Sequence, residues 1–497
     1  MRSAYGVESV RAAERVVMAR GPEGVLMKRA AAGLAAECAQ VLGKVYGARV
    51  VLLVGSGDNG GDALYAGARL ARRGAGVSAV LLDPERAHAG GLAALRGAGG
   101  SVVGADDPRA EGLVRGARLV VDGIVGIGGR GGLRERAAEL VAAARGGLVV
   151  AVDVPSGVDA DTGEVRGEAV RADVTVTFGA YKPGLLVDPG REYAGVVRLV
   201  EIGLELAPDE VAVEALQFAD VARLLPTPGG ESDKYRRGVV GIVAGSARYP
   251  GAAVLAVAGA LRAGAGAVRY VGPAADAVIA RFPEVLVSAG PPSKAGRVQA
   301  WVVGPGLGDD GERLGEVLAA DVPVLIDADG LRLAGERAVR ERGAPTLLTP
   351  HAGEAAALLG VAREEVEAGR LSAVRELARR YGATALLKGS TTLVASETGA
   401  VRVNPTGTAW LATAGSGDVL SGLAGSLLAA GLDARDAGAV GAYLHGLAGR
   451  YAADGAPVGA QDVAEAIPTA WREVGKSGGV TSGRRDVGTS GGARLGG

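Results

Sequence analysis

Residues 411–422 combine a glycine-rich turn with an acidic residue in a pattern that indicates phosphate chemistry. Gly415, Ser416 and Gly417 are small enough for backbone N–H groups to approach an anion, and the apolar run after them predicts a buried helix. Unpaired N–H groups and the helix dipole both favour negative charge at such a turn. Asp418 would repel phosphate, so its presence predicts a general base or a partner for Mg²⁺ in phosphoryl transfer. The alternative is that Asp418 caps the helix.

Four more segments of the second half place small, polar or charged residues just past a predicted strand. Open α/β sheets bind ligands at this edge. Lys388 ends one strand and is followed by hydroxyl residues, and His351 lies in a loop three residues before Glu354. His351 is predicted to belong to a site, whereas Glu354 fits a site or the N-terminus of a helix equally well. The segments are 239–253, 302–308, 349–354 and 386–392.

The first half also carries polar side chains where predicted strands end. Asn59 and Asp62 lie in the glycine-rich turn after one apolar strand, and Asp122 and Asp153 end two others. The carboxyl ends of parallel strands share one edge, so we expect these side chains to lie close together. Oxygen ligands without His or Cys suit a hard cation. The alternative is that these Asp residues cap the turns that follow.

Short β-branched runs alternate with Ala-rich helical stretches along the chain. This βαβ pattern predicts mostly parallel, doubly wound sheets with helices on both faces. Four helices are expected at 7–19, Val25–Leu42, 61–73 and 133–145. The first-half strands are expected at Arg49–Val54, 77–82, 119–121, Leu148–Val152, Val174–Phe178 and Val196–Val200.

The pattern breaks around 205–231, where Pro and Gly gather, and a second α/β series follows. Its strands are expected at 238–244, 268–271, Ala300–Val303, 324–327, Thr346–Leu348, 384–388 and 392–396. We therefore predict domains at 1–212 and 213–474. Residues 475–497 contain almost nothing to bury and are predicted to be disordered.

Composition limits the classes of function. The chain has 497 residues, 48% of them hydrophobic but only 3% aromatic, and 84 Gly, which suits close helix–sheet packing. A net charge of -1 gives no electrostatic footprint for nucleic acid. The single Cys38 excludes a disulfide framework, and no apolar run reaches membrane-spanning length. We expect a cytoplasmic enzyme with a small-molecule substrate, no nucleic-acid or membrane partner, and a homo-oligomeric state.

Five segments of the second half resemble the ADP-dependent NAD(P)H-hydrate dehydratases of the ribokinase-like fold over residues 214–474. They are YPGA, VGPGLG, TPHAGE, LLKGSTT and ATAGSGDVLSG. The resemblance implies that ADP, with Mg²⁺, phosphorylates the hydroxyl of the (S)-hydrate. Elimination of phosphate then leaves NAD(P)H and AMP.

The same resemblance implies roles for individual residues. Asp418 would take the hydroxyl proton, and the amides of 415–417 would stabilise the transferring group. The adenine nucleotide would be held by Lys388, Gly389, Ser390, Thr391, Thr392, Gly415, Ser416 and Gly417. The hydrate would be lined by Ala253, Gly306, His351 and Asp418. The chain departs from the family where a Ser-His-Lys-Gly run is usual, because SDKYRRG stands at 232–238.

The first half resembles the NAD(P)H-hydrate epimerases over residues 1–212, through VGSGDNGGD and TFGAYKPG. The resemblance implies a Rossmann-like domain that interconverts the (R)- and (S)-hydrates, with Asp153 as the acid–base group. A K⁺ ion would be bound by Asn59, Asp122 and Ser156. The hydrate would contact Asp153 together with Asp58, Asn59, Gly60, Gly61, Asp62, Gly126, Ile127, Gly128, Gly129, Arg130, Gly131 and Gly132.

Three positions depart from the epimerase pattern. Asp58 replaces an Asn and adds negative charge where a phosphate-bearing ligand is expected, Ala63 replaces a Gly, and Ile127 replaces a Thr. Two alternatives therefore stay open. The second half could be a small-molecule kinase, for example of a vitamin alcohol, built on the same Gly-Ser-Gly-Asp turn. The first half could be a non-catalytic ligand-binding or assembly module.

Overall fold

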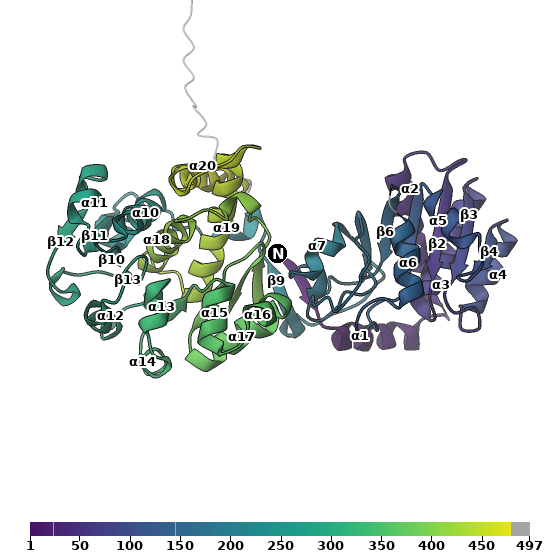
Figure 1. Cartoon of the computed structure of the whole chain (residues 1–497), viewed down its shortest axis with the longest axis horizontal. Helices are drawn as coiled ribbons and strands as arrows, with labels where there is room; N and C mark the ends of the chain where they lie inside the picture. Colours follow the sequence, from purple (N-terminus) through teal and green to yellow (C-terminus); the bar gives the residue numbers. More distant parts are fainter. Residues whose placement is uncertain (23, 145, 479–497) are drawn as a thin grey trace, which may run out of the picture.

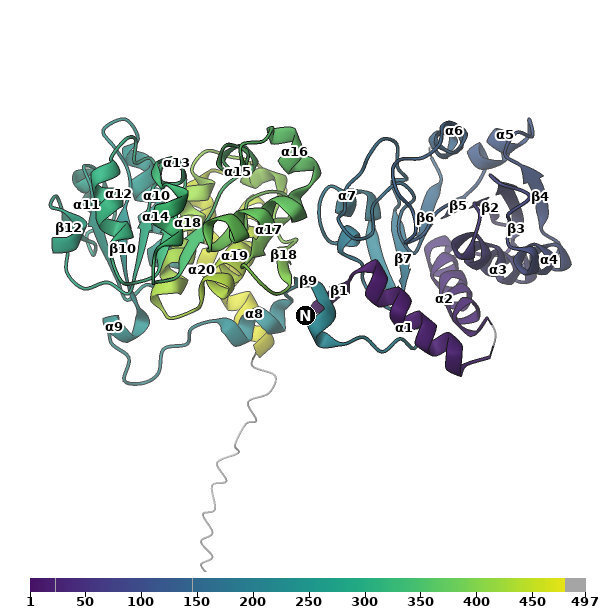
Figure 2. The ribbon, with the colours of Figure 1, turned by 90° about the horizontal axis from the view of Figure 1, so that it is seen from below.

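The computed structural model describes residues 1–22, 24–144 and 146–478 and contains two α/β halves, each built on its own sheet. Figures 1 and 2 show the halves side by side, with the N-terminus between them. The predicted fold class, two doubly wound α/β units, is confirmed. None of the helices in the described ranges is long and apolar enough to cross a membrane.

The first sheet has seven strands in the order β4-β3-β2-β5-β6-β7-β8, all parallel. Alternate residues of β2 enter different cores. Val50, Leu52 and Val54 pack towards α2 and α3, whereas Val51 and Leu53 pack towards α5 and α6. The central strands β2 and β5 are almost entirely apolar and buried because helices cover both faces of the sheet.

The strands of this sheet are β2 (Arg49–Val54), β3 (Gly76–Leu81), β4 (Ser101–Gly104), β5 (Leu119–Gly123), β6 (Leu148–Val152), β7 (Val174–Phe178) and β8 (Val196–Val200). Its helices are α1 (Val7–Arg20), α2 (Val25–Leu42), α3 (Asp58–Arg72), α4 (Ala89–Gly97), α5 (Ala110–Arg115), α6 (Glu135–Ala143) and α7 (Gly190–Ala194).

The second sheet has eleven strands in the order β1-β9-β18-β17-β16-β15-β14-β13-β10-β11-β12. The run from β16 to β12 is parallel, and β17 pairs antiparallel with both β16 and β18. Its two faces also carry separate cores. One core contains Val240 and Ile242 with α10, α18 and α19, and the other contains Val243 and Trp301 with α12, α15 and α17.

The strands of the second sheet are β1 (Arg2–Tyr5), β9 (Val211–Ala215), β10 (Val239–Val243), β11 (Ala267–Val271), β12 (Leu286–Ser288), β13 (Ala300–Val303), β14 (Val324–Ile326), β15 (Thr346–Leu348), β16 (Thr384–Leu387), β17 (Thr392–Ala395) and β18 (Val401–Asn404). Its helices are α8 (Phe218–Leu224), α9 (Lys234–Arg237), α10 (Pro250–Arg262), α11 (Ala275–Arg281), α12 (Gly311–Leu318), α13 (Asp329–Leu333), α14 (Glu336–Arg340), α15 (Ala352–Leu359), α16 (Arg363–Ala368), α17 (Arg370–Tyr381), α18 (Ser416–Ala429), α19 (Ala434–Ala453) and α20 (Ala460–Gly478).

Strands β1 and β9 were not predicted, and both lie in the second sheet. Strand β1 pairs antiparallel with β9, which pairs parallel with β18. The start of the chain therefore adds an edge strand to the half that begins some two hundred residues later, whereas the sequence assigned all of 1–212 to the first domain. Helix α20 reaches Gly478, so the predicted tail is helical at its start. Residues 479–497 lie outside the described part of the chain.

Each sheet reverses its strand order at one point that fixes where a ligand can bind. The reversal lies between β2 and β5 in the first sheet and between β10 and β13 in the second. The loops after such neighbouring strands diverge and leave a crevice at their carboxyl ends. Sites are therefore expected where the turns after β2 and β5, and after β10 and β13, meet.

Candidate active sites

The turn before α18 forms the anion-binding geometry that the sequence predicted. Gly415 precedes the helix in the left-handed conformation (φ 87°), which glycine adopts without strain. Ser416 Oγ donates to the Leu411 carbonyl at 2.7 Å, which ties the turn to the preceding residues. Within the described chain, no acceptor contacts the N–H groups of Gly417 and Asp418. These two donors are free for an anion.

Lys388 lies beside this turn in an ion pair that holds its ammonium in place. Its Nζ donates to Asp327 Oδ1 at 2.8 Å and lies 3.8 Å from Glu354 Oε2. Ser421 Oγ donates to Asp327 Oδ2 at 2.6 Å, so the carboxylate is held on both sides. A Cβ on Gly417 would be 3.4 Å from Lys388 Nζ, which brings the predicted lysine and glycine turn together.

The electrostatics of this cluster make Asp418 a candidate base. Burial, with a smaller contribution from the Asp327 carboxylate, raises the pKa of Asp418 to about 7. Burial opposes the charge on Lys388, yet the carboxylates of Asp327 and Glu354 outweigh it and raise the pKa of Lys388. A carboxyl group that titrates near neutral pH beside a fixed ammonium suits proton transfer. A capping role has no support here, because no side chain caps α18.

Asp327 is the member of this cluster that the sequence reasoning missed. It follows the apolar strand β14, the same signal that identified Asp122 and Asp153 in the first half. Ala328, the next residue, has a positive φ of 48°, which a residue with a Cβ adopts only under strain. Such strain is typical of functional loops. Here it accompanies a sharp change of chain direction between Asp327 and Asp329.

His351 has a structural role that the sequence did not predict. It caps α15, since its Nδ1 accepts from the Glu354 N–H at 3.1 Å and its own N–H donates to Glu354 Oε2 at 2.8 Å. Its side chain is 59% exposed. Glu354 therefore both closes a capping box and faces Lys388. Contact of His351 with a hydrate stays a prediction.

The two remaining predicted hydrate contacts lie where the loops after β10 and β13 meet. The Gly245 N–H donates to the Pro305 carbonyl at 2.7 Å, which joins the loops. Gly306 has φ 60°, and a Cβ there would lie 2.7 Å from Ala252 Cβ, so only glycine fits. Ala253 is fully buried at the start of α10. The Gly308 N–H donates to Asp329 Oδ2 at 2.8 Å, so these loops adjoin the Asp327 turn.

In the first half, Asp153 forms a buried ion pair that the sequence did not predict. Its Oδ1 accepts from Lys182 Nζ at 2.5 Å, from Thr177 Oγ1 at 3.0 Å and from the Phe178 N–H at 3.2 Å. Lys182 is only 1% exposed. Asp153 has φ 66°, strained for a residue other than glycine. Lys182 belongs to the TFGAYKPG segment, which carries the resemblance to the epimerases, but the sequence predicted no role for the lysine itself.

Two further carboxyl groups surround this ion pair and favour their neutral form. Burial, followed by repulsion from Asp153 and Asp58, raises the pKa of Asp62 well above its ordinary value. Burial and the Asp153 charge also raise the pKa of Glu14, a residue of α1 that the sequence reasoning missed. The cluster therefore combines an ion-paired carboxylate with carboxyl groups whose neutral form is favoured, a combination suited to acid–base catalysis.

The predicted K⁺ ligands also converge. Ser156 donates to Asp122 through its Oγ at 2.7 Å and through its N–H at 2.8 Å. Asn59 Oδ1 lies beside Gly126, where a Cβ would be 2.9 Å away, and Asn59 Nδ2 is buried without a partner. Burial raises the pKa of Asp122 to about 6, against the lowering effect of Ser156. A buried carboxylate with amide and hydroxyl oxygens nearby suits a hard cation.

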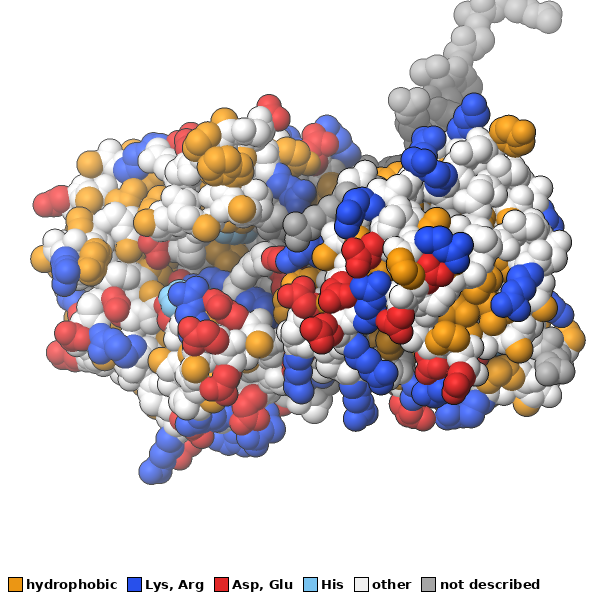
Figure 3. Space-filling view, turned by 45° about the vertical axis from the view of Figure 1, so that its right-hand side comes forward, with side chains coloured by type: hydrophobic (Ala, Val, Ile, Leu, Met, Phe, Trp, Pro, Cys, Tyr) orange, Lys and Arg blue, Asp and Glu red, His pale blue; other side chains and the backbone are white. Residues whose placement is uncertain are grey.

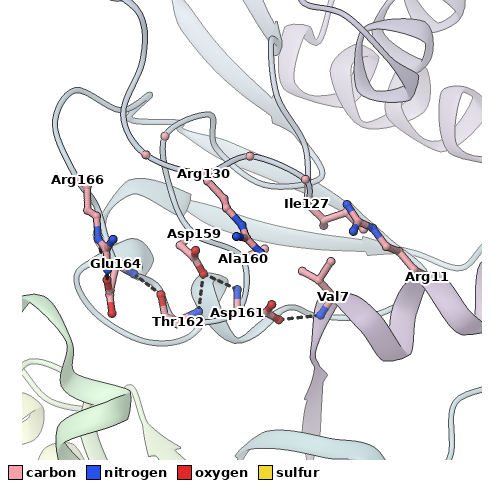
Figure 4. Close-up of a pocket in the computed structure, with 14 residues that line it drawn as sticks. Val7, Arg11, Ile127, Arg130, Asp159, Ala160, Asp161, Thr162, Glu164 and Arg166 are labelled. Carbon is pink, nitrogen blue, oxygen red and sulfur yellow. Dashed lines mark hydrogen bonds and ion pairs between the residues drawn. The ribbon is translucent and has the colours of Figure 1, made fainter.

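The loop 126–132 lines a separate cavity of about 350 Å³ (Figure 4). Residues 127–131 form one side, and Asp159, Thr162 and Glu164 form another. Arg11 of α1 enters the cavity near Ile127, so α1 contributes to both the cavity and, through Glu14, the Asp153 cluster. The cavity carries three guanidinium groups, those of Arg11, Arg130 and Arg166. Asn59, Asp62 and Asp153 do not line it, so the predicted substrate residues occupy two neighbouring places.

Charged side chains of both signs lie on the face that Figure 3 shows. Figure 3 shows Lys and Arg side chains interspersed with Asp and Glu over both halves. Within the described residues, no group of three or more His, Cys, Asp or Glu side chains could hold a metal ion. The Asn59, Asp122 and Ser156 set is of another kind, because it combines one carboxylate with amide and hydroxyl oxygens.

Known families match both halves. The family described as NAD(P)H-hydrate dehydratase matches residues 240–469, and the one described as YjeF-related protein N-terminus matches residues 23–184. A solved ADP/ATP-dependent NAD(P)H-hydrate dehydratase from Bacillus subtilis is 29% identical with a TM-score of 0.49, and the match covers 52% of this chain and 97% of that chain.

Whole-length relatives match the two halves together. The bifunctional NAD(P)H-hydrate repair enzyme Nnr of Mycobacterium leprae (strain TN) is 50% identical over 465 residues, 91% of this chain and 94% of the relative. The enzyme of the same name from Mycobacterium tuberculosis (strain ATCC 25618 / H37Rv) is 49% identical over 451 residues, 88% of this chain and 92% of the relative. The chain belongs to the family of bifunctional NAD(P)H-hydrate repair enzymes.

Proposed function

We propose that this chain repairs hydrated NADH and NADPH. The first half interconverts the (R)- and (S)-hydrates, and the second half dehydrates the (S)-hydrate with ADP, giving NAD(P)H, AMP and phosphate. The observation that carries the proposal is the position of Asp418, whose pKa is raised to about 7 at the start of α18, beside Lys388 and two free N–H groups.

In the second half, Asp418 accepts the proton of the hydrate's hydroxyl as its oxygen attacks the β-phosphorus of ADP, and AMP leaves. Lys388 and the N–H groups of Gly417 and Asp418 stabilise the charge on the transferring phosphoryl group. The C–O bond to the ring carbon then breaks, phosphate leaves with the bonding electron pair, and loss of a proton from the neighbouring ring carbon restores the double bond. Mg²⁺, when bound with the nucleotide, would neutralise phosphate charge.

We assign the remaining predicted residues of this half by their place around the turn. Gly389, Ser390, Thr391 and Thr392 continue from Lys388 and are positioned to hold the adenine nucleotide. Ala253 lies in the first turn of α10, and Gly306 and His351 lie in the segments after β13 and β15, where the hydrate would enter.

In the first half, Asp153 takes the hydroxyl proton while the ring C–N bond opens, and Asp62 donates a proton to the ring nitrogen. Reclosure on the other face of the carbonyl reverses both transfers and gives the other epimer. The Lys182 ammonium lies 2.5 Å from Asp153 and balances the charge of its carboxylate, and burial with neighbouring carboxylates raises the pKa of Asp62, which favours its protonated form. The cavity over 127–131 would hold the dinucleotide phosphates through Arg11 and Arg130.

A K⁺ ion, when bound, would be held by Asn59, Asp122 and Ser156 and would order the turns after β2 and β5. Asp58 and Ile127 lie on these same turns, so the departures from the family pattern concern affinity and leave the Asp153 and Lys182 pair intact. A homo-oligomeric state and a cytoplasmic location stay predictions from the sequence.

The test is recovery of the reduced nicotinamide absorbance from mixed NADH-hydrate epimers with ADP and Mg²⁺. We expect complete recovery by the intact chain, with AMP formed in step. Asp418→Asn should lower the rate about 10²- to 10⁴-fold. With Asp153→Asn, recovery of the absorbance should stop near the fraction of the mixture that is the (S)-hydrate. Because the epimers also interconvert spontaneously, the two variants are compared in the first minutes of reaction.

The alternatives give different products. A small-molecule kinase would release ADP from ATP in the presence of an alcohol and would restore no absorbance with ADP. A non-catalytic first half would leave (R)-hydrate consumption unchanged in Asp153→Asn. Either result would overturn the corresponding part of the proposal.

A further inference from the structure

A short segment of the first half runs from one candidate site to the other. It begins at Lys182, the partner of Asp153, and ends six residues later at Asp188. Between them, Leu186 and Val187 are buried in a core otherwise made mainly of second-half residues. The segment is therefore anchored in the second half before it reaches Asp188.

The carboxylate of Asp188 is bonded to the loop that follows Lys388. Its Oδ2 accepts from Ser390 Oγ at 2.5 Å, from the Thr391 N–H at 2.8 Å and from Thr391 Oγ1 at 2.8 Å. The side chain is only 5% exposed, and Oδ1 is buried without a partner. Three donors on one carboxylate oxygen, out of water, form a strong and geometrically specific contact.

Arg370 holds the same loop from the second half. Its Nη2 donates to the carbonyls of Lys388 at 3.1 Å and Thr391 at 3.0 Å, and the side chain is 6% exposed. A Cβ on Gly389 would lie 2.3 Å from Arg370 Nη2, so the loop fits closely on the guanidinium. Arg370 therefore fixes the loop carbonyls while Asp188 fixes its donors.

We propose that Asp188 is a positioning residue for the adenine nucleotide, supplied by the first half to the nucleotide-binding loop of the second. The inference rests on the proposed function, in which residues 388–392 hold ADP. Thr391 is fully buried and ties the loop to Asp188, so Ser390 and the loop backbone would be presented to the nucleotide in an orientation that the second half alone does not impose. The fused first half thereby completes the dehydratase site as well as supplying its substrate.

The test is ADP-dependent dehydration of purified (S)-hydrate, which needs no epimerase activity. We expect Asp188→Ala to raise the KM for ADP about tenfold, equivalent to about 1.4 kcal/mol, with kcat within about twofold of the unchanged chain. Asp188→Asn keeps the side-chain volume and one acceptor oxygen, so its KM for ADP should lie between those of the unchanged chain and Asp188→Ala. The KM for the hydrate should stay unchanged.

The matched control is Asp173→Asn. Asp173 also lies in the first half and accepts a backbone N–H, from Val149 at 2.8 Å, but it contacts no residue of the nucleotide loop. It should leave the KM for ADP unchanged. If Asp188→Ala fails to fold, Asp188→Asn carries the same comparison.

A double-mutant cycle adds a readout that general destabilisation would not move. Asp188→Asn and Ser390→Ala should be strongly non-additive in the KM for ADP, because one acts through the other. An unchanged KM for ADP in both Asp188 variants, or additive effects in the cycle, would overturn the proposal. Failure of the unchanged chain to consume ADP would instead reject the proposed function, so the two failures are distinguishable.

Discussion

At the scale of single residues, the charged form of Asp418 is destabilised in the folded chain, although its proposed role requires that form. Burial and the Asp327 charge raise its pKa to about 7, so its ionised form is less stable in the folded chain than in the unfolded chain. A base must be ionised, and dehydration should therefore speed up as pH rises through about 7. Ionisation of Asp418 therefore lowers the free energy of unfolding over a pH range in which stability can be measured.

We therefore predict that Asp418→Asn is more stable than the unchanged chain at pH 8. The folded pKa lies above the unfolded value, so stability is lost as pH rises from about 4 to about 7, by at most about 4 kcal/mol. The Asn variant does not lose this stability, because its amide does not ionise. Thermal melts should show a gap in Tm of several degrees at pH 8 that narrows towards pH 5.

The control for this prediction is Asp276→Asn, an exposed acidic residue in the first turn of α11. This variant should show no gain in Tm over the unchanged chain at pH 8. A gap for Asp418→Asn that is absent at pH 8, or that widens on acidification, would show that the carboxyl group is not destabilised in the fold.

At the scale of elements, α1 connects the cavity of the first half to its acid–base cluster. Arg11 lines the cavity and Glu14 faces Asp153, one turn apart on the same helix. Gly6 offers no side chain to cap α1, and Asp161 Oδ1 instead accepts from the Val7 N–H at 2.7 Å. The loop below the cavity thus sets where α1 begins (Figure 4).

We predict that Asp161→Ala weakens the first activity without touching the second. Loss of a capping acceptor costs about 1 kcal/mol and frays the turn that precedes Arg11. The KM for the (R)-hydrate should rise severalfold, while ADP-dependent dehydration of purified (S)-hydrate stays the same. Glu8→Ala, on the exposed first turn of α1, is the control and should change neither.

The sequence predicts the elements better than it predicts the contacts between them. Helix α2 and strands β2, β6, β7 and β8 lie at their predicted bounds, since long apolar runs carry their own signal. Strand β1 has four residues, and its partners, β9 and Tyr181, lie far away in the sequence. Lys182 and Glu14 were missed for the same reason: their roles depend on Asp153, to which no spacing in the sequence connects them.

At the scale of the whole molecule, the two halves share structure. The second half takes β1, Leu186 and Val187 from the first half into its sheet and core, and Asp188 into its loop. Unfolding either half therefore exposes apolar surface and unpaired groups of the other. The molecule should behave as one cooperative unit rather than as two linked domains.

This prediction can be checked because all three Trp residues, Trp301, Trp410 and Trp471, lie in the second half. Thermal melts followed by Trp fluorescence, which reports the second half, and by far-ultraviolet circular dichroism, which reports both, should coincide. A biphasic dichroism melt in which fluorescence follows only one phase would show that the halves unfold independently.

The pairing of β1 with β9 also sets an order of events during synthesis. Arg2 pairs with Ala215, so the partner of the first strand leaves the ribosome some 10 to 40 s later, at about 5 to 20 residues per second. The first half can fold within that interval while its leading strand waits unpaired. Strand β1 can pair only after β9 has been synthesised, so the sheet of the second half is completed with residues made long before the rest of that half.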